Sequence, residues 1–196
     1  MIETLVAGHG SAAPAGGTDA APPGGGQAPS STPGSGIGTM TVDGFLDALA
    51  SSRPTPGGGA MAAVSAAAGA ALLAMVARLT TGRKGYETLE GRMAEVAALA
   101  DAERIALTAL ADRDTAAFDA VMAAYHQPRS TDGERVARSA AVQSALTGAA
   151  EVPLEVARRA AGLLPTAREL VETGNANAIS DAYSAGQLLH LSLIHI

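Results

Sequence analysis

Three groups of residues have types and spacings that could support chemistry. The first is the run PTPGGGA at residues 54–60, which leads directly into a helical pattern. Three glycines let the backbone approach a ligand closely, and a helix start presents unpaired N–H groups that suit an anion or a polarised oxygen. The run lacks the Gly-Lys-Ser/Thr ending of a nucleotide-binding P-loop. Its spacing fits a tight loop between closely packed helices equally well, so both interpretations stay open.

The second group is Lys84 with Tyr86. Lys84 is the only lysine in a chain with twelve arginines. Because arginine is otherwise used throughout, the single lysine favours a role for a compact ammonium group that can lose its proton. The alternative is an ordinary surface lysine that follows the end of a helix. Tyr86 could stack on a flat heterocycle or hydrogen-bond to it, or simply be a core aromatic residue.

The third group consists of polar residues beside turns. Asp114 and Asp181 could act as general bases or orient one, and Asp114 could equally be a charge at a helix start. Asn175, Asn177 and Ser180 precede Asp181 at a turn-to-helix junction. Capping accounts for one or two of these four residues, which favours a ligand-facing role for the others. No spacing of His, Asp or Glu resembles a metal site, so we expect none.

The elements that must position these residues are helical almost throughout, which predicts an all-α bundle. Thr41 or Asp43 can cap a short helix that ends before the 54–60 run. Residues Ala60–Ala77, small and uncharged, predict a central, buried, Ala-rich helix. The 24 uncharged residues between Arg53 and Arg78 are long enough to span a membrane. We favour a soluble core helix, because the stretch opens with proline and glycine and has no aromatic belt.

The later helices follow from periodicity and helix breakers. A heptad stripe runs from Leu89 to Leu110, and its one charge, Glu103, should pair with an arginine of a neighbouring helix or subunit. The length of the stripe predicts a homodimer. A further helix should start at Asp112–Asp114, and a capping box at Thr131–Glu134 should start a long one. We expect breaks or kinks at Pro153, Gly162 and Pro165, and a turn at Gly174-Asn175 before a final helix.

Composition divides the chain into three parts. Residues 1–39 hold ten of the 23 glycines and no Lys or Arg, which predicts a disordered tail. Residues 40–190 form the expected helical domain. Residues 191–196 resemble the translation of a transposon end sequence used in sequencing libraries, so we expect an adaptor-derived tail and a domain incomplete at its C-terminus. The alternative is a genuine apolar strand or helix end. The net charge of −6 argues against nucleic-acid binding, and the lack of cysteine excludes disulfides and a thiol nucleophile. Without a signal peptide, we expect a cytoplasmic protein.

A set of short motifs lies in a fixed order along the chain. The motifs are Phe45-Leu46, ALAS at 48–51, PTPGGG at 54–59, Met75–Ala77, Gly82, Lys84, Tyr86, Asp114, Ala117-Phe118, Val121-Met122, Pro128, Gln143, Val152–Leu154, Gly174-Asn175 and Ser180-Asp181. Over about residues 40–190, this ordered set resembles the cyclodeaminase/cyclohydrolase family of folate enzymes. This family includes the C-terminal domain of formiminotransferase-cyclodeaminase and standalone methenyltetrahydrofolate cyclohydrolases. One departure is Ala60, where the family usually has serine.

The resemblance implies chemistry at the one-carbon bridge between N5 and N10 of tetrahydrofolate. The reaction is hydrolysis of 5,10-methenyltetrahydrofolate to 10-formyltetrahydrofolate, or cyclodeamination of 5-formiminotetrahydrofolate. The substrate is a tetrahydrofolate derivative, with or without a polyglutamate tail, and no other cofactor is implied. Arg53 or Arg83 would meet the carboxylates of the glutamate tail. The implied proton-handling residues are Lys84, Asp181 and Asp114. The implied substrate-binding residues are Pro56, Gly57, Gly58, Gly59, Tyr86, Asn175, Asn177 and Ser180.

The reaction needs an acid, a base and a polar stabiliser around one carbon atom. We therefore expect Lys84, Tyr86, Asp181 and the Gly57–Gly59 loop to meet in one cleft, within a chain or between subunits. The alternative is a non-catalytic helical assembly module or an inactive fragment, in which the glycine loop and the Ala-rich helix serve only packing.

Overall fold

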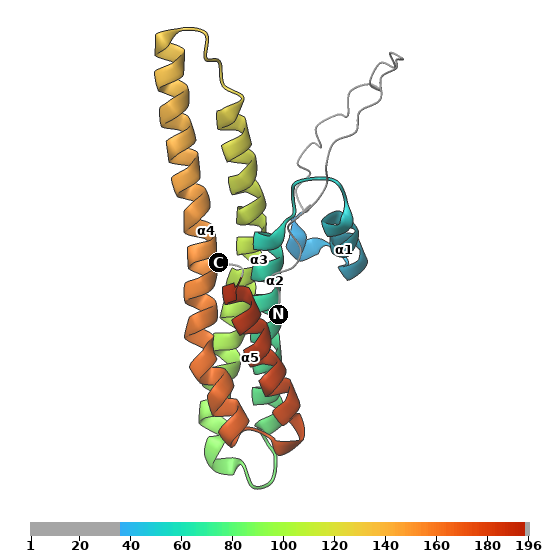
Figure 1. Cartoon of the computed structure of the whole chain (residues 1–196). Coiled ribbons are helices and arrows are strands. Elements are labelled where there is room, and N and C mark those ends of the chain that lie inside the picture. Colours follow the sequence, from blue (N-terminus) through green and yellow to red (C-terminus); the bar gives the residue numbers. More distant parts are fainter. Residues whose placement is uncertain (1–35, 195–196) are drawn as a thin grey trace, which may run out of the picture. The chain divides into compact units, whose positions relative to one another are not determined.

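The computed structural model describes residues 36–194, and residues 1–35 and 195–196 lie outside that range (Figure 1). Most of the expected N-terminal tail and the end of the expected adaptor tail are therefore not described. The described part begins with η1 (Ile37–Thr39), a single 3-10 turn in contact with α3. The backbone N–H of Ile37 donates to Oδ1 of Asp112 at 2.6 Å. Residues 36–39, which composition assigned to the tail, thus pack against the helical domain.

The first α-helix is α1 (Val42–Ala50), as expected from its cap. Thr41 is the N-cap, and its hydroxyl accepts a hydrogen bond from the backbone N–H of Gly44 at 3.1 Å. Phe45 and Ala48 are its buried residues. The segment after α1 reaches α2 without further helix, because the two prolines of the 54–60 run cannot donate backbone hydrogen bonds.

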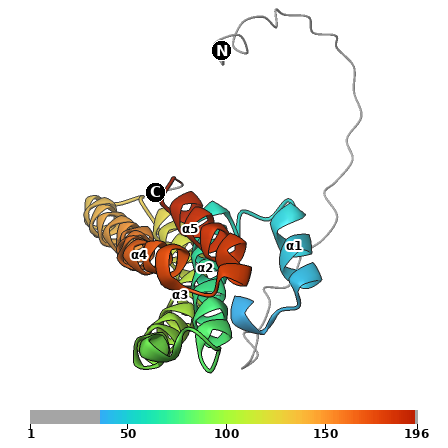
Figure 2. The same cartoon turned by 90° about the horizontal axis from the view of Figure 1, so that it is seen from below.

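The Ala-rich segment forms α2 (Gly58–Thr80), which lies at the centre of the helices in Figure 2. It packs chiefly against α3 and α5. A Cβ at Gly69 would stand 3.0 Å from both the Ala185 carbonyl and the Leu189 side chain, so the small residue is what allows α5 to approach. Thirteen of the 23 residues of α2 are buried, more than in any other described helix, and this confirms the predicted core helix. Its burial is incomplete, since Met61 is 38% exposed.

By length and composition alone, α2 could also cross a membrane. Two thirds of its most apolar window is buried against the other helices of this chain. That burial is typical of a core helix in a bundle.

After a 3-10 turn, η2 (Glu87–Leu89), the chain forms one continuous helix, α3 (Glu90–Tyr125). The predicted new helix at Asp112–Asp114 was wrong: no glycine or proline interrupts the chain there, and both carboxylates lie along the side of α3. The expected contact of Glu103 is confirmed, because it pairs with Arg159 of α4 at 3.0 Å. The heptad stripe itself is buried inside this chain, so it leaves no surface for a second copy; its buried members are Met93, Val96, Ala100, Leu107 and Leu110.

The longest helix is α4 (Asp132–Thr173), which starts at the predicted capping box. The Thr131 hydroxyl accepts from the backbone N–H of Glu134, while the Glu134 carboxylate accepts from that of Thr131. The expected breaks at Pro153, Gly162 and Pro165 were wrong, because α4 continues through all three. Each proline removes only one hydrogen bond from the helix, and burial of Val152, Val156 and Leu163 holds the segment in place.

The chain turns through η3 (Ala176–Ala178) into α5 (Ile179–Ile194), close to the predicted start of the final helix. Residues 191–194, expected to belong to an adaptor tail, continue α5. Ser192 is fully buried there, and its hydroxyl has no hydrogen-bond partner among residues 36–194. A buried hydroxyl without a partner destabilises the position it occupies.

The two long helices α3 and α4 lie side by side, joined by ion pairs such as Arg92 to Glu169 at 2.8 Å. At one end both helices continue past the start of α2 (Figure 1). We call these parts, residues 115–125 of α3 and 132–150 of α4, the hairpin arm. Within the hairpin arm only Val121 and Ala124 are buried. The arm therefore carries most of its side chains outside the core.

Candidate functional site

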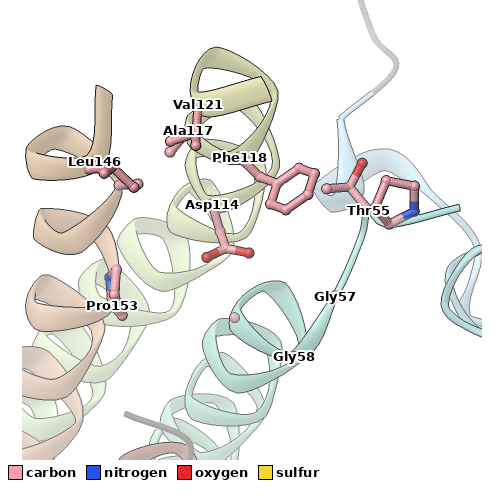
Figure 3. A pocket seen from close by; sticks show the side chains of 12 residues that line it. Thr55, Gly57, Gly58, Asp114, Ala117, Phe118, Val121, Leu146 and Pro153 are labelled. Atoms are coloured by element: carbon pink, nitrogen blue, oxygen red, sulfur yellow. The ribbon is translucent and has the colours of Figure 1, made fainter. Parts of the chain in front are cut away.

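A pocket of about 480 Å³ lies where the glycine loop meets the base of the hairpin arm (Figure 3). That volume is within the usual range for small-molecule sites. The loop and the start of α2 form one side, while α3 and α4 form the other. The lining residues are Pro54, Thr55, Gly57, Gly58, Gly59, Asp114, Ala117, Phe118, Val121, Leu146, Ala149 and Pro153.

Among the described residues that line the pocket, Asp114 is the only ionisable one. Its side chain points from α3 toward the first turn of α2 (Figure 3). A Cβ built on Gly59 would stand 2.1 Å from its Oδ1 atom and 2.5 Å from its Cγ atom. Since real Cβ atoms do not come that close, the absence of a side chain at Gly59 makes room for the carboxylate. Asp114 is therefore held at the positive end of the α2 dipole, although it does not start a helix.

The start of α2 supplies hydrogen-bond donors to the same pocket. Its N-cap is Gly57, which has no side chain to bond the first backbone N–H groups. An α-helix leaves its first N–H groups without intrahelical partners. Gly58 and Gly59 both line the pocket, so their backbone can approach a ligand oxygen without a Cβ in between.

The opposite wall adds a backbone acceptor. Pro153 has no N–H, so the carbonyl of Ala149, one turn earlier in α4, lacks its ordinary helical donor. Both residues line the pocket. The wall is otherwise apolar, and Phe118 of α3 faces Thr55 across the opening (Figure 3). The pocket thus combines apolar surface for a flat ring with one carboxylate, donors from α2 and one acceptor from α4.

Pro56 precedes Gly57 at the start of α2, but it is not among the residues that line the pocket. The remaining sequence-predicted site residues lie at the opposite end of α2. Lys84 is exposed in the loop that follows α2, and Asp181 is half-buried in the first turn of α5. The Tyr86 hydroxyl accepts a hydrogen bond from the backbone N–H of Ala176 at 3.1 Å. Tyr86 therefore ties the loop after α2 to the turn before α5. Asn177 and Ser180 are exposed beside it.

Asn175 has a structural role at this junction. It is only 3% exposed, and its side chain donates to the Leu79 carbonyl at 2.8 Å while accepting from the Asn177 N–H at 3.0 Å. Its backbone N–H donates to the buried Thr80 hydroxyl at 2.9 Å. These bonds favour a residue that fixes the α4–α5 connection rather than one that faces a ligand.

The predicted convergence of all these residues in one cleft was wrong for a single chain. Gly57–Gly59 and Asp114 lie at the start of α2, and Lys84, Tyr86 and Asp181 lie at its end. A helix of 23 residues is about 34 Å long at 1.5 Å per residue. No folate bridge can touch both ends at once.

Residue types and spacing do not identify the apolar wall as a set of site residues. Phe118, Val121 and Pro153 stood among the motifs of the family resemblance, but their types alone suggest core packing. A usable signal was available in Pro153, since a proline inside a helical pattern frees a carbonyl on the same face. Leu146 and Ala149 carry no such signal and follow only from the course of α4.

Comparisons with known proteins identify the family of this chain. A family model described as formiminotransferase-cyclodeaminase matches residues 41–195. A methenyltetrahydrofolate cyclohydrolase of Methylorubrum extorquens is 47% identical over 145 residues, which cover 74% of this chain and 70% of that protein. The chain belongs to the formiminotransferase-cyclodeaminase family.

Other members of the family match the same region. The mouse formimidoyltransferase-cyclodeaminase is 35% identical over 161 residues, which cover 82% of this chain but 30% of that protein. This chain thus spans about a third of the mouse protein. The crystal structure of a formiminotetrahydrofolate cyclodeaminase from Thermotoga maritima superposes with a TM-score of 0.71 at 36% identity, covering 81% of this chain and 77% of that one. The fold is therefore that of the family.

Proposed function

We propose that this chain is an enzyme of folate one-carbon metabolism that acts on the N5/N10 bridge of tetrahydrofolate. The observation that carries the proposal is the Asp114 carboxylate held against Gly59 at the start of α2, in a pocket with an apolar wall. Relatives named for methenyltetrahydrofolate hydrolysis and for cyclodeamination support the same substrate class.

Hydrolysis of the methenyl bridge is the reaction that we favour. The 47% identical relative is named as a cyclohydrolase, and its length is mostly covered by this chain. In this reaction water adds to the cationic bridge carbon, and the bond from that carbon to N5 breaks. Of the two protons of the attacking water, one goes to N5 and one leaves to solvent. The negative Asp114 suits the cationic bridge and can accept the proton of the attacking water. The backbone donors of Gly58 and Gly59 suit the oxygen as charge develops on it.

Cyclodeamination is the second candidate, favoured by the solved relative from Thermotoga maritima. There N10 attacks the formimino carbon, ammonia leaves, and one proton is taken up to form the cationic methenyl product. The same carboxylate and donors would serve the tetrahedral centre of this reaction. Both reactions move only protons and a one-carbon unit, so we propose no cofactor beyond the folate substrate.

Substrate binding in this proposal uses both walls of the pocket. The pterin ring would lie against Phe118 and Val121, with its N–H groups near the freed Ala149 carbonyl. Arg53 is exposed next to the pocket residue Pro54, where its guanidinium could meet the carboxylates of the glutamate tail. We also propose a cytoplasmic homodimer, since an open pocket at the base of an uncovered hairpin arm is suited to a second subunit.

The test is a pair of rates measured on the same preparation. Loss of the methenyl chromophore reports hydrolysis, and ammonia release from 5-formiminotetrahydrofolate reports cyclodeamination. We expect methenyl hydrolysis well above the rate in buffer. Ammonia release with no methenyl hydrolysis would make the chain a cyclodeaminase, whereas neither activity would favour the helical assembly module or inactive fragment.

A further inference from the structure

A second pocket of about 300 Å³ lies in the groove between α3 and α4, and we call it the groove pocket. Among residues 36–194, none from the glycine loop or from α2 lines it, and it shares no lining residue with the pocket at Asp114. Its volume is at the lower end of the usual range for small-molecule sites. The groove pocket is therefore a separate cavity that the proposed folate chemistry does not use. Its lining residues are Leu99, Glu103, Arg158, Arg159, Gly162 and Leu163.

One wall of the groove pocket is fixed by a chain of ion pairs. The Arg159 guanidinium donates to Oε2 of Glu103 at 3.0 Å and to Oε1 of Glu155 at 2.9 Å. Glu155 also accepts a hydrogen bond from Arg113 of α3 at 2.9 Å. These two arginines and two glutamates hold α3 and α4 together, and their charges cancel. Arg159 therefore shapes the wall but offers a ligand little net charge.

Two charged groups of the groove pocket have bonding capacity left over. Arg158 is exposed, and it forms no ion pair or hydrogen bond with the described part of the chain. Glu103 uses Oε2 for Arg159, while its Oε1 atom has no hydrogen-bond partner among the described residues. A guanidinium group carries five donors, and each oxygen of a carboxylate can accept. One positive donor and one negative acceptor thus remain available to a ligand in the same cavity.

The rest of the lining is apolar and open. Leu163 is buried at 1% exposure, whereas Leu99 of α3 is 44% exposed. A Cβ built on Gly162 would meet nothing within 4 Å, so packing does not require a glycine at that position. Glycine inside a helix is destabilising relative to alanine. The effect of Gly162 is to keep the groove free of a side chain between the two leucines and the charged groups.

We propose that the groove pocket binds a free α-amino acid with an apolar side chain. The ligand's carboxylate accepts from the Arg158 guanidinium, and its ammonium group donates to Oε1 of Glu103. Its side chain lies in the open space over Gly162, against Leu99 and Leu163.

The two unused charges favour a zwitterion over a simple ion. An anion such as phosphate would be attracted by Arg158 but repelled by the Glu103 carboxylate in the same cavity. A simple amine would meet the reverse situation. A molecule that carries both charges on one carbon atom satisfies both groups, and its apolar side chain covers the exposed part of Leu99. The proposal does not rest on the folate chemistry, because no residue of the groove pocket takes part in it.

The first test is a ligand series that removes one charge at a time. The probes are L-leucine, 4-methylpentanoate, which lacks the ammonium group, and 3-methylbutylamine, which lacks the carboxylate. Each is titrated into the full ¹⁵N-labelled chain while the backbone amide signal of Gly162 is followed by NMR. We expect a saturable shift with leucine at millimolar concentration. Either analogue should bind at least tenfold more weakly, roughly the effect of losing one charge-assisted hydrogen bond.

Every other result of the series would overturn the proposal. Binding of 4-methylpentanoate as tight as that of leucine would make the groove pocket a plain carboxylate site. Equal binding of the amine would make it a plain cation site. No saturable shift with leucine would mean that it is not an amino-acid site.

The second test removes the unused cation from the protein. Arg158→Gln should weaken leucine binding at least tenfold, roughly the effect of one lost charge-assisted bond. Arg129→Gln is the matched control. Arg129 is an exposed arginine between α3 and α4 whose guanidinium also forms no ion pair with the described residues, but it does not line the groove pocket. Its affinity should stay within about twofold of the parent. Equal leucine affinity of Arg158→Gln and the parent would refute the role of Arg158.

The third test fills the groove without touching a charge. Gly162→Leu places a side chain in the space assigned to the ligand and should abolish leucine binding. Gly148→Leu is its control, because Gly148 is also an exposed helical glycine of α4 with nothing within 4 Å of a Cβ, and it lies outside the groove pocket. Both changes favour the helix, so unfolding does not account for a loss of binding. Leucine binding that survives in Gly162→Leu, or that is lost equally in Gly148→Leu, would overturn the placement of the ligand.

Discussion

Gly59 and Asp114 lie in direct apposition, although they belong to different helices and are far apart in the sequence. A Cβ on Gly59 would stand 2.1 Å from Oδ1 of Asp114. The bare backbone at Gly59 is thus what lets a carboxylate reach the N-terminal turn of α2. The glycine run therefore positions Asp114, in addition to any contact of its own with a ligand.

The Gly59→Ala variant is expected to lose activity while staying folded. The new methyl group displaces a carboxylate at the end of a flexible side chain, so the pocket changes more than the core does. We expect turnover to fall at least tenfold, in line with loss of a positioned general base. Gly91→Ala is the matched control, because nothing lies within 4 Å of a Cβ at that helical position. It should keep full turnover and gain about 0.5–1 kcal/mol of stability. Parental turnover in Gly59→Ala would contradict the claim that the missing side chain at Gly59 positions the Asp114 carboxylate.

Tyr86→Phe tests whether the tyrosine hydroxyl is structural. Its oxygen accepts from the Ala176 N–H at 3.1 Å, and phenylalanine offers no acceptor. We expect the free energy of unfolding to drop by about 1 kcal/mol, the net value of one such bond. Urea unfolding of the two proteins measures the difference. An unchanged stability together with a raised KM would instead favour a ligand-binding hydroxyl.

Pro153→Ala should raise the free energy of unfolding and weaken substrate binding. Alanine restores a donor for the Ala149 carbonyl inside α4, so we expect about 1–3 kcal/mol of added stability, up to the full proline penalty in a helix. The same change withdraws a ring and an acceptor from the pocket wall, which should raise KM. Thermal unfolding and steady-state kinetics measure the two effects. A gain in stability without any kinetic change would show that the proline serves only the helix.

Acid should weaken the contact between α3 and α4. The Arg92 guanidinium lowers the pKa of Glu169, so this pair stabilises the fold above the ordinary glutamate pKa of about 4.3 and loses its effect as pH falls through the lower folded-state value. Glu169→Gln should therefore be less stable than the parent at pH 7, by about 0.5–1 kcal/mol for a partly exposed pair, and approach it at pH 3. Glu172→Gln, which removes a more exposed pair within α4, should show a smaller difference. A constant gap between Glu169→Gln and the parent from pH 7 to pH 3 would contradict this assignment.

The sequence was informative where local chemistry decides the structure. The Thr131 capping box, the Thr41 cap and the uncharged run of α2 each produced the helix that they predict. Prediction from the sequence was wrong where packing overrides a local signal. A break was predicted at Pro153, but α4 continues through this residue because burial outweighs one missing hydrogen bond. The sequence did not predict where the site lies. Residue types indicate which groups suit the chemistry, but they do not indicate which end of a long helix those groups occupy. Only the course of α2 separates Lys84 from Asp114.

The most direct test of the account compares hydrolysis of 5,10-methenyltetrahydrofolate by the parent chain, Asp114→Asn and Asp101→Asn. The last variant carries the same substitution on the same helix, but Asp101 pairs with Arg78 and is not part of the pocket. With all three proteins folded, we predict that loss of the methenyl absorbance is at least tenfold slower for Asp114→Asn and within about twofold of the parent for Asp101→Asn. Equal rates for Asp114→Asn and the parent would contradict the central claim that the pocket at Gly59 and Asp114 is where the one-carbon bridge reacts.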